Sequence, residues 1–228
     1  MYKIVLLRHG ESEWNAQNKF TGWVDIGLTN EGIAQAKKAG LLLKEKGFVF
    51  DLAFTSVLKR AVETLEIVLE VMGLSAIEKE KAWQLNERHY GLLQGVNKQE
   101  AVERFGLEQV ITWRRGYKAR PPGIEKENPG SESLEDVFNR VFSYWQEKIA
   151  PALLNKKKIL ISAHGNSLRA LVKMLDNISD HEIEKVNIPI AIPLVYELNE
   201  DLQPNKSYYL GEEQAINQAI ESIRNQIK

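Results

Sequence analysis

The sequence predicts an α/β fold, specifically a single-domain three-layer α/β/α arrangement with a mostly parallel sheet flanked by helices. Two observations indicate this class. Short β-prone apolar runs alternate with longer segments whose apolar residues recur every three or four positions, the pattern of a sheet covered by helices. In addition, no long linker divides the 228 residues, so we expect one domain over residues 1–228.

The first part of the chain contains two strand–helix units. Residues 4–7 and 51–54 are predicted buried strands. Thr29 is placed to cap the first helix, which is expected to stop near Gly47. Thr55-Ser56 is expected to cap the second. The predicted inner face of that second helix comprises Val57, Ala61, Leu65 and Val68.

The middle of the chain has a different composition, rich in Arg, Glu, Trp, Tyr and Gly. We expect residues 83–130 to form an insert packed on the sheet, with short helices at 98–105 and 107–115. Pro121-Pro122-Gly123 interrupts the chain, and residues 124–130 are a predicted polar loop.

The last part returns to strand–helix alternation. Ser133 and Asp136 fit a capping box at the start of a helix that is expected to run to Pro151. A helix is predicted after Gly165, and an amphipathic C-terminal helix over residues 212–228. The predicted strands of this part are residues 159–162, 194–198 and 207–210.

Composition excludes several classes of protein. Thirty basic and 31 acidic residues give a net charge of −1, which disfavours non-specific nucleic-acid binding. The apolar run at residues 4–7 is too short for a membrane span or a signal-peptide core. The absence of cysteine excludes disulfides, thiolate metal sites and a thiol nucleophile, and it fits a reducing compartment. We therefore expect a cytoplasmic protein without nucleic-acid or membrane partners.

Two segments resemble each other and direct attention to two histidines. Residues 4–12 and 159–167 each consist of a predicted strand, then His-Gly, then Ser two residues later. Ligands of α/β proteins bind beyond the carboxyl ends of strands, so His9 and His164 are expected to face one another there. His181, in a polar stretch, is interpreted as part of a solvated helix start.

Arginines near these histidines favour phosphoryl transfer. A neutral imidazole is a good nucleophile near pH 7, and neighbouring positive charge favours the neutral form. Arg8 adjoins His9, and Arg60 lies in the first turn of a helix that follows a strand. Both would bind a phosphoryl group at the same edge of the sheet. The chain has no His-Glu-x-x-His motif, and the adjacent arginine disfavours a metal at His9.

Longer motifs resemble the 2,3-bisphosphoglycerate-dependent phosphoglycerate mutases of the histidine phosphatase superfamily. The resemblance extends in order from residue 2 to about residue 211 and implies the phosphoglycerate mutase-like fold. The motifs that carry it are residues 7–15 (Leu-Arg-His-Gly-Glu-Ser-Glu-Trp-Asn), 20–23, 55–61, 85–91, 113–116 and 163–169.

The resemblance implies a role for each matching residue. His9 would carry the phosphoryl group on Nε2, Glu87 would exchange the proton of the substrate hydroxyl, and His164 would stabilise the transition state. Arg8 and Arg60 would clamp the phosphoryl group. The remaining substrate-binding residues would be Asn15, Thr21, Gly22, Arg88, His89, Tyr90, Lys98, Arg114, Arg115, Gly165 and Asn166.

The reaction implied is the glycolytic and gluconeogenic interconversion of 3-phosphoglycerate and 2-phosphoglycerate. It would proceed through a phosphohistidine, with 2,3-bisphosphoglycerate as intermediate and phosphoryl primer and without a metal. A phosphomonoesterase of the same superfamily is the alternative; Lys98 with Arg114 and Arg115 suits a second anionic group and favours the mutase. A non-catalytic phosphate sensor is disfavoured because the residue set is complete.

Two features concern assembly. Dimers are the commonest homo-oligomers, so we expect a homodimer. Residues 123–131 form a short connection where many relatives carry a long loop, which puts in question any subunit contact or active-site cover that the long loop provides.

Overall fold

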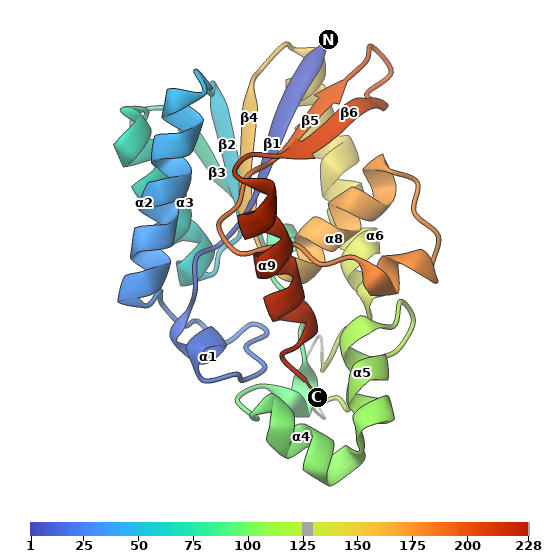
Figure 1. Cartoon of the computed structure of the whole chain (residues 1–228). Coiled ribbons are helices and arrows are strands. Elements are labelled where there is room, and N and C mark those ends of the chain that lie inside the picture. The colour runs from blue at the N-terminus through green and yellow to red at the C-terminus, as the bar shows by residue number, and fades with distance from the viewer. Residues whose placement is uncertain (125–129, 228) are drawn as a thin grey trace.

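The computed structural model describes residues 1–124 and 130–227, and its centre is one mixed sheet (Figure 1). The strand order is β3-β2-β4-β1-β5-β6. Strands β3, β2, β4 and β1 pair in parallel, whereas β5 is antiparallel to both of its neighbours. The mostly parallel sheet is therefore confirmed. The strands are β1 (Tyr2–Arg8), β2 (Leu52–Thr55), β3 (Glu78–Lys81), β4 (Ile159–Ala163), β5 (Leu194–Leu198) and β6 (Pro204–Tyr209).

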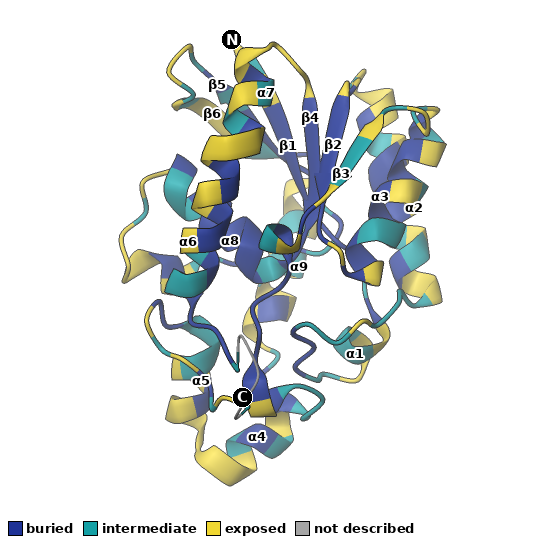
Figure 2. Cartoon of the chain, turned by 180° about the vertical axis from the view of Figure 1, so that it is seen from behind, coloured by how far each residue is buried: buried dark blue, intermediate teal, exposed yellow. Residues whose placement is uncertain are grey.

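Helices cover both faces of the sheet. Val5 and Leu7 of β1 pack with α2 (Asn30–Glu45) and α3 (Lys59–Met72). The alternate residues Ile4 and Leu6 belong to a second core with α6, η3, α7 and α8. Figure 2 shows the buried strands between these two layers, which confirms the three-layer α/β/α fold. The bounds of the second layer are α6 (Leu134–Tyr144), the π-helical turn η3 (Trp145–Ile149), α7 (Ala150–Leu154) and α8 (Gly165–Leu175).

The remaining elements gather mainly beyond the carboxyl ends of β1, β2 and β4. Helices α4 and α5 lie there, and α9 runs from the end of β6 toward α4 (Figure 1). This arrangement places parts of the middle segment and of the C-terminal segment at the edge where the two His-Gly sequences occur. The elements are α1 (Glu13–Ala16), η1 (Trp83–Leu85), η2 (Gly91–Leu93), α4 (Lys98–Phe105), α5 (Leu107–Arg115), η4 (Glu182–Lys185) and α9 (Glu213–Arg224).

Several local predictions are confirmed. Thr29 accepts a hydrogen bond from Gly32 at the start of α2, and Ser133 and Asp136 form the capping box of α6. Helices α4 and α5 have the predicted bounds. The strand predicted at 207–210 begins earlier, at Pro204, and the final helix is shorter than 212–228.

One strand was not predicted, and the predictions for two helices need correction. Strand β3 has the sequence Glu-Lys-Glu-Lys and lies at the edge of the sheet, so no apolar pattern marks it. Thr55 and Ser56 do not cap α3: Leu58 is its N-cap, without a side-chain hydrogen bond, and Val57 is 49 % exposed. The helix predicted to end at Pro151 continues to Leu154. Pro151 lies in the first turn of α7, where proline is tolerated.

The short connection at 123–131 falls mostly on residues 125–129, which lie outside the described residues. Its two ends are held together. The Ile124 N–H donates to the Gly130 carbonyl at 2.9 Å, and the Ser131 hydroxyl donates to the Pro121 carbonyl at 2.7 Å.

Candidate active site

One pocket at the carboxyl ends of β1 and β4 collects most of the residues singled out in the sequence. It combines side chains from the strand ends, the first helices, the middle segment and the C-terminal segment. The predicted residues that line it are Arg8, His9, Asn15, Thr21, Gly22, Arg60, Glu87, Tyr90, Lys98, Arg114, Arg115, Gly165 and Asn166. His164, Arg88 and His89 are not among the lining residues, but the ring of His164 contacts that of His9.

His9 is the first residue after β1, and its ring is held in one orientation. The backbone N–H of His9 donates to the Ala163 carbonyl at 3.0 Å, and Nδ1 of the His9 ring lies 2.6 Å from the Gly10 carbonyl oxygen. Because a carbonyl oxygen only accepts, Nδ1 carries the proton of the neutral ring and Nε2 keeps its lone pair. Burial, followed by the positive charges of Arg60 and Arg8, holds the pKa of His9 well below 6.5. The ring is therefore neutral at pH 7.

A close backbone approach positions the turn that follows His9. A Cβ at Gly10 would lie 2.3 Å from the Gly32 carbonyl oxygen, and a Cβ at Gly32 would lie 2.1 Å from that of Glu11. The Gly10 N–H donates to the Thr64 hydroxyl at 3.0 Å. Two facing glycines thus allow the turn to rest on the first turn of α2, and Thr64 of α3 holds it from the other side.

His164 follows β4 and is the N-cap of α8. Its ring is fully buried and stands edge to face against His9, with 5.0 Å between ring centroids. The Ser56 hydroxyl oxygen lies 2.7 Å from Nε2. Burial and the charge of Arg60 hold the pKa of His164 well below 6.5. Within the described residues, Nδ1 is buried and has no hydrogen-bond partner.

Two buried arginines flank the histidine pair. Arg60 is only 1 % exposed and donates to the Val24 and Gly22 carbonyls at 3.0 and 2.7 Å. Arg8 donates to the Ile188 carbonyl at 2.9 Å. The Nε atoms of both guanidinium groups are buried with no partner in the described parts of the chain. Burial lowers the pKa of Arg60 to about 10, so both groups remain positive at pH 7.

Glu87 is the carboxylate among the lining residues. Its Oε1 accepts from the Asn166 N–H at 3.1 Å, from Asn166 Nδ2 at 2.8 Å and from the Arg88 N–H at 2.7 Å. The carbonyl oxygen of Glu87 accepts from Trp23 Nε1 at 2.5 Å and from Arg140 at 3.0 Å. Arg140 is in turn paired with the buried Glu132 at 2.8 Å. Both the side chain and the backbone of Glu87 are thus fixed.

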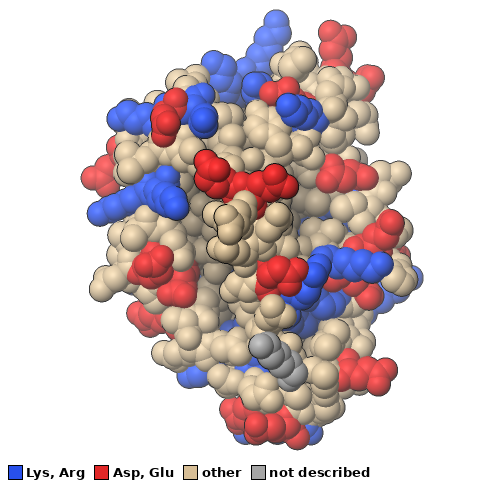
Figure 3. Space-filling view, in the orientation of Figure 1, with Lys and Arg blue, Asp and Glu red and all other residues tan. Residues whose placement is uncertain are grey.

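A second cationic group lines the same pocket and consists of Lys98, Arg114 and Arg115. Lys98 is 6 % exposed, and burial together with the charge of Arg114 holds its pKa well below 10.5. Burial, then the charge of Arg115, lowers the pKa of Arg114 to about 9. The concentration of positive charge is internal: Figure 3 shows acidic and basic side chains interspersed over the outer face.

The C-terminal segment (residues 213–227) packs against this second cationic group. Gln226 Oε1 accepts from Lys98 Nζ at 3.0 Å and from Arg114 at 2.6 Å, and Arg114 also donates to the Ile223 carbonyl at 2.9 Å. Asn18 Nδ2 donates to the Gln226 carbonyl at 3.0 Å. A carboxamide oxygen thereby lies where two cations converge.

Arg88 and His89 support the site from outside the pocket. Arg88 is fully buried and donates to the Tyr90 hydroxyl at 3.2 Å and to the Arg114 carbonyl at 2.7 Å. The Nδ1 atom of His89 accepts from the Gly91 N–H at 3.1 Å, and its ring packs against Trp23. Their predicted contact with substrate is therefore not reproduced by the pocket lining.

Sequence reasoning missed several lining residues. Arg169 had a signal, since it lies three positions after Asn166 and so on the same face of the helix. The final helix gave no indication of which polar side chain would reach the pocket. The missed residues are Lys19, Phe20, Arg169, Asn187, Ile188, Ile223 and Gln226.

Residues 1–124 and 130–227 contain neither a membrane-spanning helix nor a cluster of metal ligands. No helix there is long and apolar enough to cross a membrane. No group of three or more His, Asp or Glu side chains is arranged to hold a metal ion there.

The chain resembles known proteins along its whole length. It is 49 % identical to a 2,3-bisphosphoglycerate-dependent phosphoglycerate mutase of Borreliella afzelii (strain PKo) over 246 aligned residues, with 100 % of this chain and 99 % of the relative covered. That alignment is longer than the 228 residues of the chain, so the relative contains residues that this chain lacks.

Solved structures share the fold. A mycobacterial glucosyl-3-phosphoglycerate phosphatase, solved as a complex with VO3, superposes with a TM-score of 0.76 at 22 % identity and covers 93 % of this chain and 99 % of its own. The α-ribazole phosphatase from Shigella flexneri has a TM-score of 0.70 at 22 % identity, with 92 % and 99 % covered. The family model of the histidine phosphatase superfamily (branch 1) matches residues 4–203. Together with the relative at 49 % identity, this match shows that the chain belongs to the histidine phosphatase superfamily.

Proposed function

We propose that this enzyme interconverts 3-phosphoglycerate and 2-phosphoglycerate in glycolysis and gluconeogenesis, with 2,3-bisphosphoglycerate as phosphoryl primer and without a metal. One observation carries the proposal: a single pocket has two separate cationic groups. Arg8 and Arg60 lie beside His9, and Lys98 with Arg114 lies under the C-terminal segment. The 49 % identity to a protein of that name supports the same reaction.

The pocket suits a bisphosphorylated acid chemically. Three buried nitrogens near His9 have no partner among the described residues: Nε of Arg8, Nε of Arg60 and Nδ1 of His164. Unpaired buried donors of this kind are retained where a ligand satisfies them, and guanidinium groups match phosphoryl oxygens. The second cationic group provides for another anionic group of the same molecule, which is what distinguishes a bisphosphoglycerate from a simple monoester.

The first half of the reaction transfers the phosphoryl group from the enzyme. The oxygen of the 2-hydroxyl of 3-phosphoglycerate forms a bond to phosphorus while the bond from phosphorus to His9 Nε2 breaks, and its electron pair returns to the ring. The hydroxyl proton passes to Glu87. Arg8 and Arg60 neutralise the charge on the transferring group, and His164 donates to it. The products are neutral His9, protonated Glu87 and 2,3-bisphosphoglycerate.

The second half reverses these steps at the other end of the intermediate. After the intermediate reorients, Nε2 of His9 attacks the phosphorus at position 3. The bond to the 3-oxygen breaks, and that oxygen takes the proton from Glu87. The enzyme regains its phosphohistidine and releases 2-phosphoglycerate, so protons and phosphoryl groups balance over the cycle.

The roles of the individual pocket residues stay predictions. Asn15, Thr21, Gly22, Tyr90, Gly165, Asn166 and Arg115 are proposed to hold the rest of the substrate, and their place in the lining supports this. The division of residues 1–228 into one domain with an insert at 83–130, the homodimer, the cytoplasmic location and the absence of nucleic-acid and membrane partners also stay predictions. Light scattering at several protein concentrations tests the homodimer.

A phosphomonoesterase is the second candidate, because His9, His164, Arg8 and Arg60 suit transfer to water equally well. The solved phosphatases share the fold, and at 22 % identity they indicate nothing further. The cationic group formed by Lys98, Arg114 and Arg115 favours the mutase.

Phosphorus NMR separates the two candidates. The protein receives 3-phosphoglycerate and a chelator, with or without a trace of 2,3-bisphosphoglycerate. The mutase produces 2-phosphoglycerate at a rate that depends on the primer and is unaffected by the chelator. Inorganic phosphate as the sole product supports the phosphatase instead, and inhibition by the chelator contradicts a metal-free reaction.

A further inference from the structure

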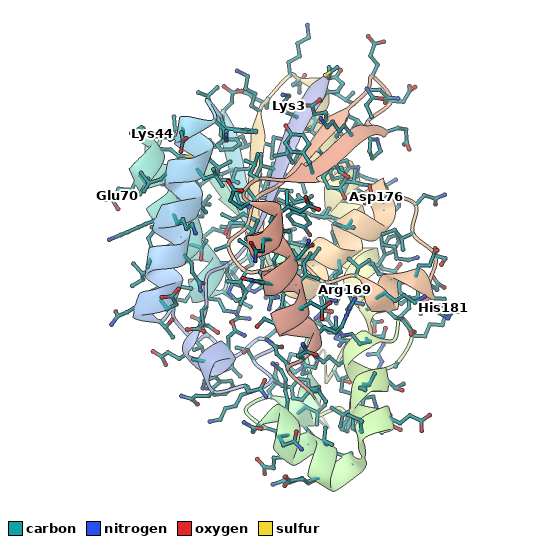
Figure 4. All side chains as sticks on the ribbon, in the orientation of Figure 1. Lys3, Lys44, Glu70, Arg169, Asp176 and His181 are labelled. Atoms are coloured by element: carbon teal, nitrogen blue, oxygen red, sulfur yellow. The ribbon has the colours of Figure 1, made fainter. Side chains whose placement is uncertain are left out.

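Arg169 is a buried cation that the proposed reaction leaves without a role. It lies on α8, is 4 % exposed and lines the pocket. In Figure 4 it lies toward the middle of the view, in contrast to the peripheral Lys3, Lys44 and His181. No ion pair with a carboxylate of the described residues involves it. A buried guanidinium without a counter-ion is costly, so its position calls for an explanation.

Three hydrogen bonds determine the orientation of the Arg169 guanidinium. One terminal nitrogen donates to the Ile183 carbonyl at 2.7 Å and to the Arg115 carbonyl at 3.1 Å. The other terminal nitrogen donates to Asn166 Oδ1 at 2.9 Å. The first two partners belong to segments far apart in sequence: Ile183 lies within η4, and Arg115 is the last residue of α5. They hold the guanidinium so that its other terminal nitrogen faces Asn166.

This contact determines which way the Asn166 carboxamide points. A carboxamide accepts at Oδ1 and donates at Nδ2, and a guanidinium has only donors. With Oδ1 facing Arg169, Nδ2 must face the other way, and it lies 2.8 Å from Glu87 Oε1 and 3.1 Å from the Tyr90 hydroxyl. The flipped amide would place Oδ1 against the carboxylate and Nδ2 against the guanidinium, which are two repulsive contacts.

The Asn166 side chain in turn helps to hold one oxygen of Glu87. Oε1 accepts three hydrogen bonds: one from Nδ2 of Asn166 and two from the backbone N–H groups of Asn166 and Arg88. Oε2 lies over Gly165, 3.6 Å from where a Cβ on that glycine would stand. Oε1 is therefore occupied, and Oε2 is the oxygen left to exchange a proton.

We propose that Arg169 is a positioning residue for proton transfer: through Asn166 it holds Oε1 of Glu87 and presents Oε2 to the substrate oxygen. This inference rests on the proton-transfer role of Glu87 in the proposed function. It applies equally to a phosphatase reaction on an alkyl phosphate, because the leaving alkoxide also needs a proton.

Phosphoryl donors with different leaving groups test this role of Arg169. The leaving oxygen of 2,3-bisphosphoglycerate needs a proton, whereas p-nitrophenyl phosphate releases a stable phenolate. Rapid mixing measures phosphohistidine formation from each donor in the wild type, Arg169→Met and Arg169→Lys. In Arg169→Met we expect the ratio of the alkyl to the aryl rate to fall roughly ten- to a hundredfold. We expect Arg169→Lys, which keeps the charge and one donor, to recover part of that ratio. Arg104→Met, at an exposed ion pair on α4, is the matched control.

A double-mutant cycle separates positioning from packing. In a Glu87→Gln background, Arg169→Met should lower the alkyl rate by less than about threefold further, because the two residues act as a unit. Asn166→Ala should reproduce the lowered ratio, which keeps the test available if Arg169→Met does not fold. Equal losses with both donors, or full additivity with Glu87→Gln, overturn the proposal. If the wild type makes no 2-phosphoglycerate but Arg169→Met still lowers the ratio of the alkyl to the aryl rate, the proposed mutase reaction is rejected and the role of Arg169 is retained.

Discussion

The rings of His9 and His164 stand edge to face, 5.0 Å apart, at the carboxyl ends of two paired parallel strands. The register explains this meeting. Arg8 of β1 pairs with Ala163 of β4, so the residues that follow leave the sheet side by side. The strand–His–Gly sequence therefore occurs twice because each of the two strand ends contributes one imidazole to the same site.

The proposed nucleophile gives the most direct prediction. His9→Ala should abolish phosphohistidine formation and reduce turnover of 3-phosphoglycerate by at least about 10³-fold, since a covalent route loses its acceptor. The protein is incubated with radiolabelled 2,3-bisphosphoglycerate, and the acid-labile label bound to it, which reports phosphohistidine, is counted separately from the acid-stable label. His181→Ala, at an exposed site, is the control and should label like the wild type. Labelling of His9→Ala at the wild-type level would refute the assignment.

Ser56 should set the tautomer of His164. Its oxygen accepts from the Leu58 N–H at 3.1 Å, which leaves the hydroxyl proton to donate to His164 Nε2 at 2.7 Å. We then expect the ring proton on Nδ1. Ser56→Ala should lower kcat roughly five- to a hundredfold, the range for removing one partner of a buried hydrogen bond, with little effect on KM. Ser143→Ala, exposed on α6, serves as the control. An unchanged kcat contradicts the prediction.

The buried histidines should make stability depend on pH. Because the folded pKa of His164 lies well below 6.5, the unfolded chain binds protons more readily than the folded protein as the pH falls below 6.5. Stability should be greatest above that pH and decrease below it, by up to about 1.4 kcal/mol per pH unit for His164 and the same for His9. Urea unfolding at pH 7.5 and 5.5 should show a smaller decrease in His164→Asn than in the wild type. Equal decreases would contradict the lowered pKa.

Gln226 should compete with the substrate for Lys98 and Arg114. Gln226→Glu places a carboxylate between these two cations and should strengthen the closed position of the C-terminal segment. We expect KM for 3-phosphoglycerate to rise roughly three- to thirtyfold, with the effect reduced by salt, in line with about 1 to 2 kcal/mol for a charge-assisted contact. Gln218→Glu on the exposed face of α9 controls for the added charge. A KM equal to that of the control would refute competition.

The close approach of Gly10 and Gly32 should be sensitive to a single methyl group. Gly32→Ala places Cβ 2.1 Å from the Glu11 carbonyl oxygen, and this backbone atom cannot move aside cheaply. We expect a loss of about 1 to 3 kcal/mol in the free energy of unfolding, the range for overpacking. The control is Gly27→Ala, where the nearest atom is the end of a flexible Glu63 side chain at 3.5 Å. Equal urea midpoints for both variants would contradict the steric argument.

The strand and helix pattern was readable where apolar periodicity and capping residues coincide. Both kinds of signal are present around Thr29 and Ser133, and there the helix starts are confirmed. Strand β3 was not predicted, because Glu-Lys-Glu-Lys at a sheet edge carries no apolar alternation. Nor does a sequence reveal that the Ser56 hydroxyl contacts a histidine 108 positions away.

The same contrast holds for the pocket residues: those in local motifs could be recognised in the sequence, whereas those placed by long-range packing could not. His9, Arg8 and Asn166 stand in local motifs, and all three line the pocket. Arg88 and His89 belong to an equally strong motif, yet they turn toward Tyr90 and Gly91. Gln226 lies two residues beyond the end of α9, whose sequence shows only an apolar stripe, so its contact with Lys98 emerges only from the packing of this helix.

The place of β4 between β2 and β1 also bears on how the protein folds. The two strands formed from the first 55 residues share no edge until β4, which begins at residue 159, inserts between them. Closing so long a loop is slow compared with forming helices. The anion pocket therefore comes into being only with the completed sheet. In refolding experiments, binding of a phosphate-bearing ligand should be gained after most of the helical circular dichroism.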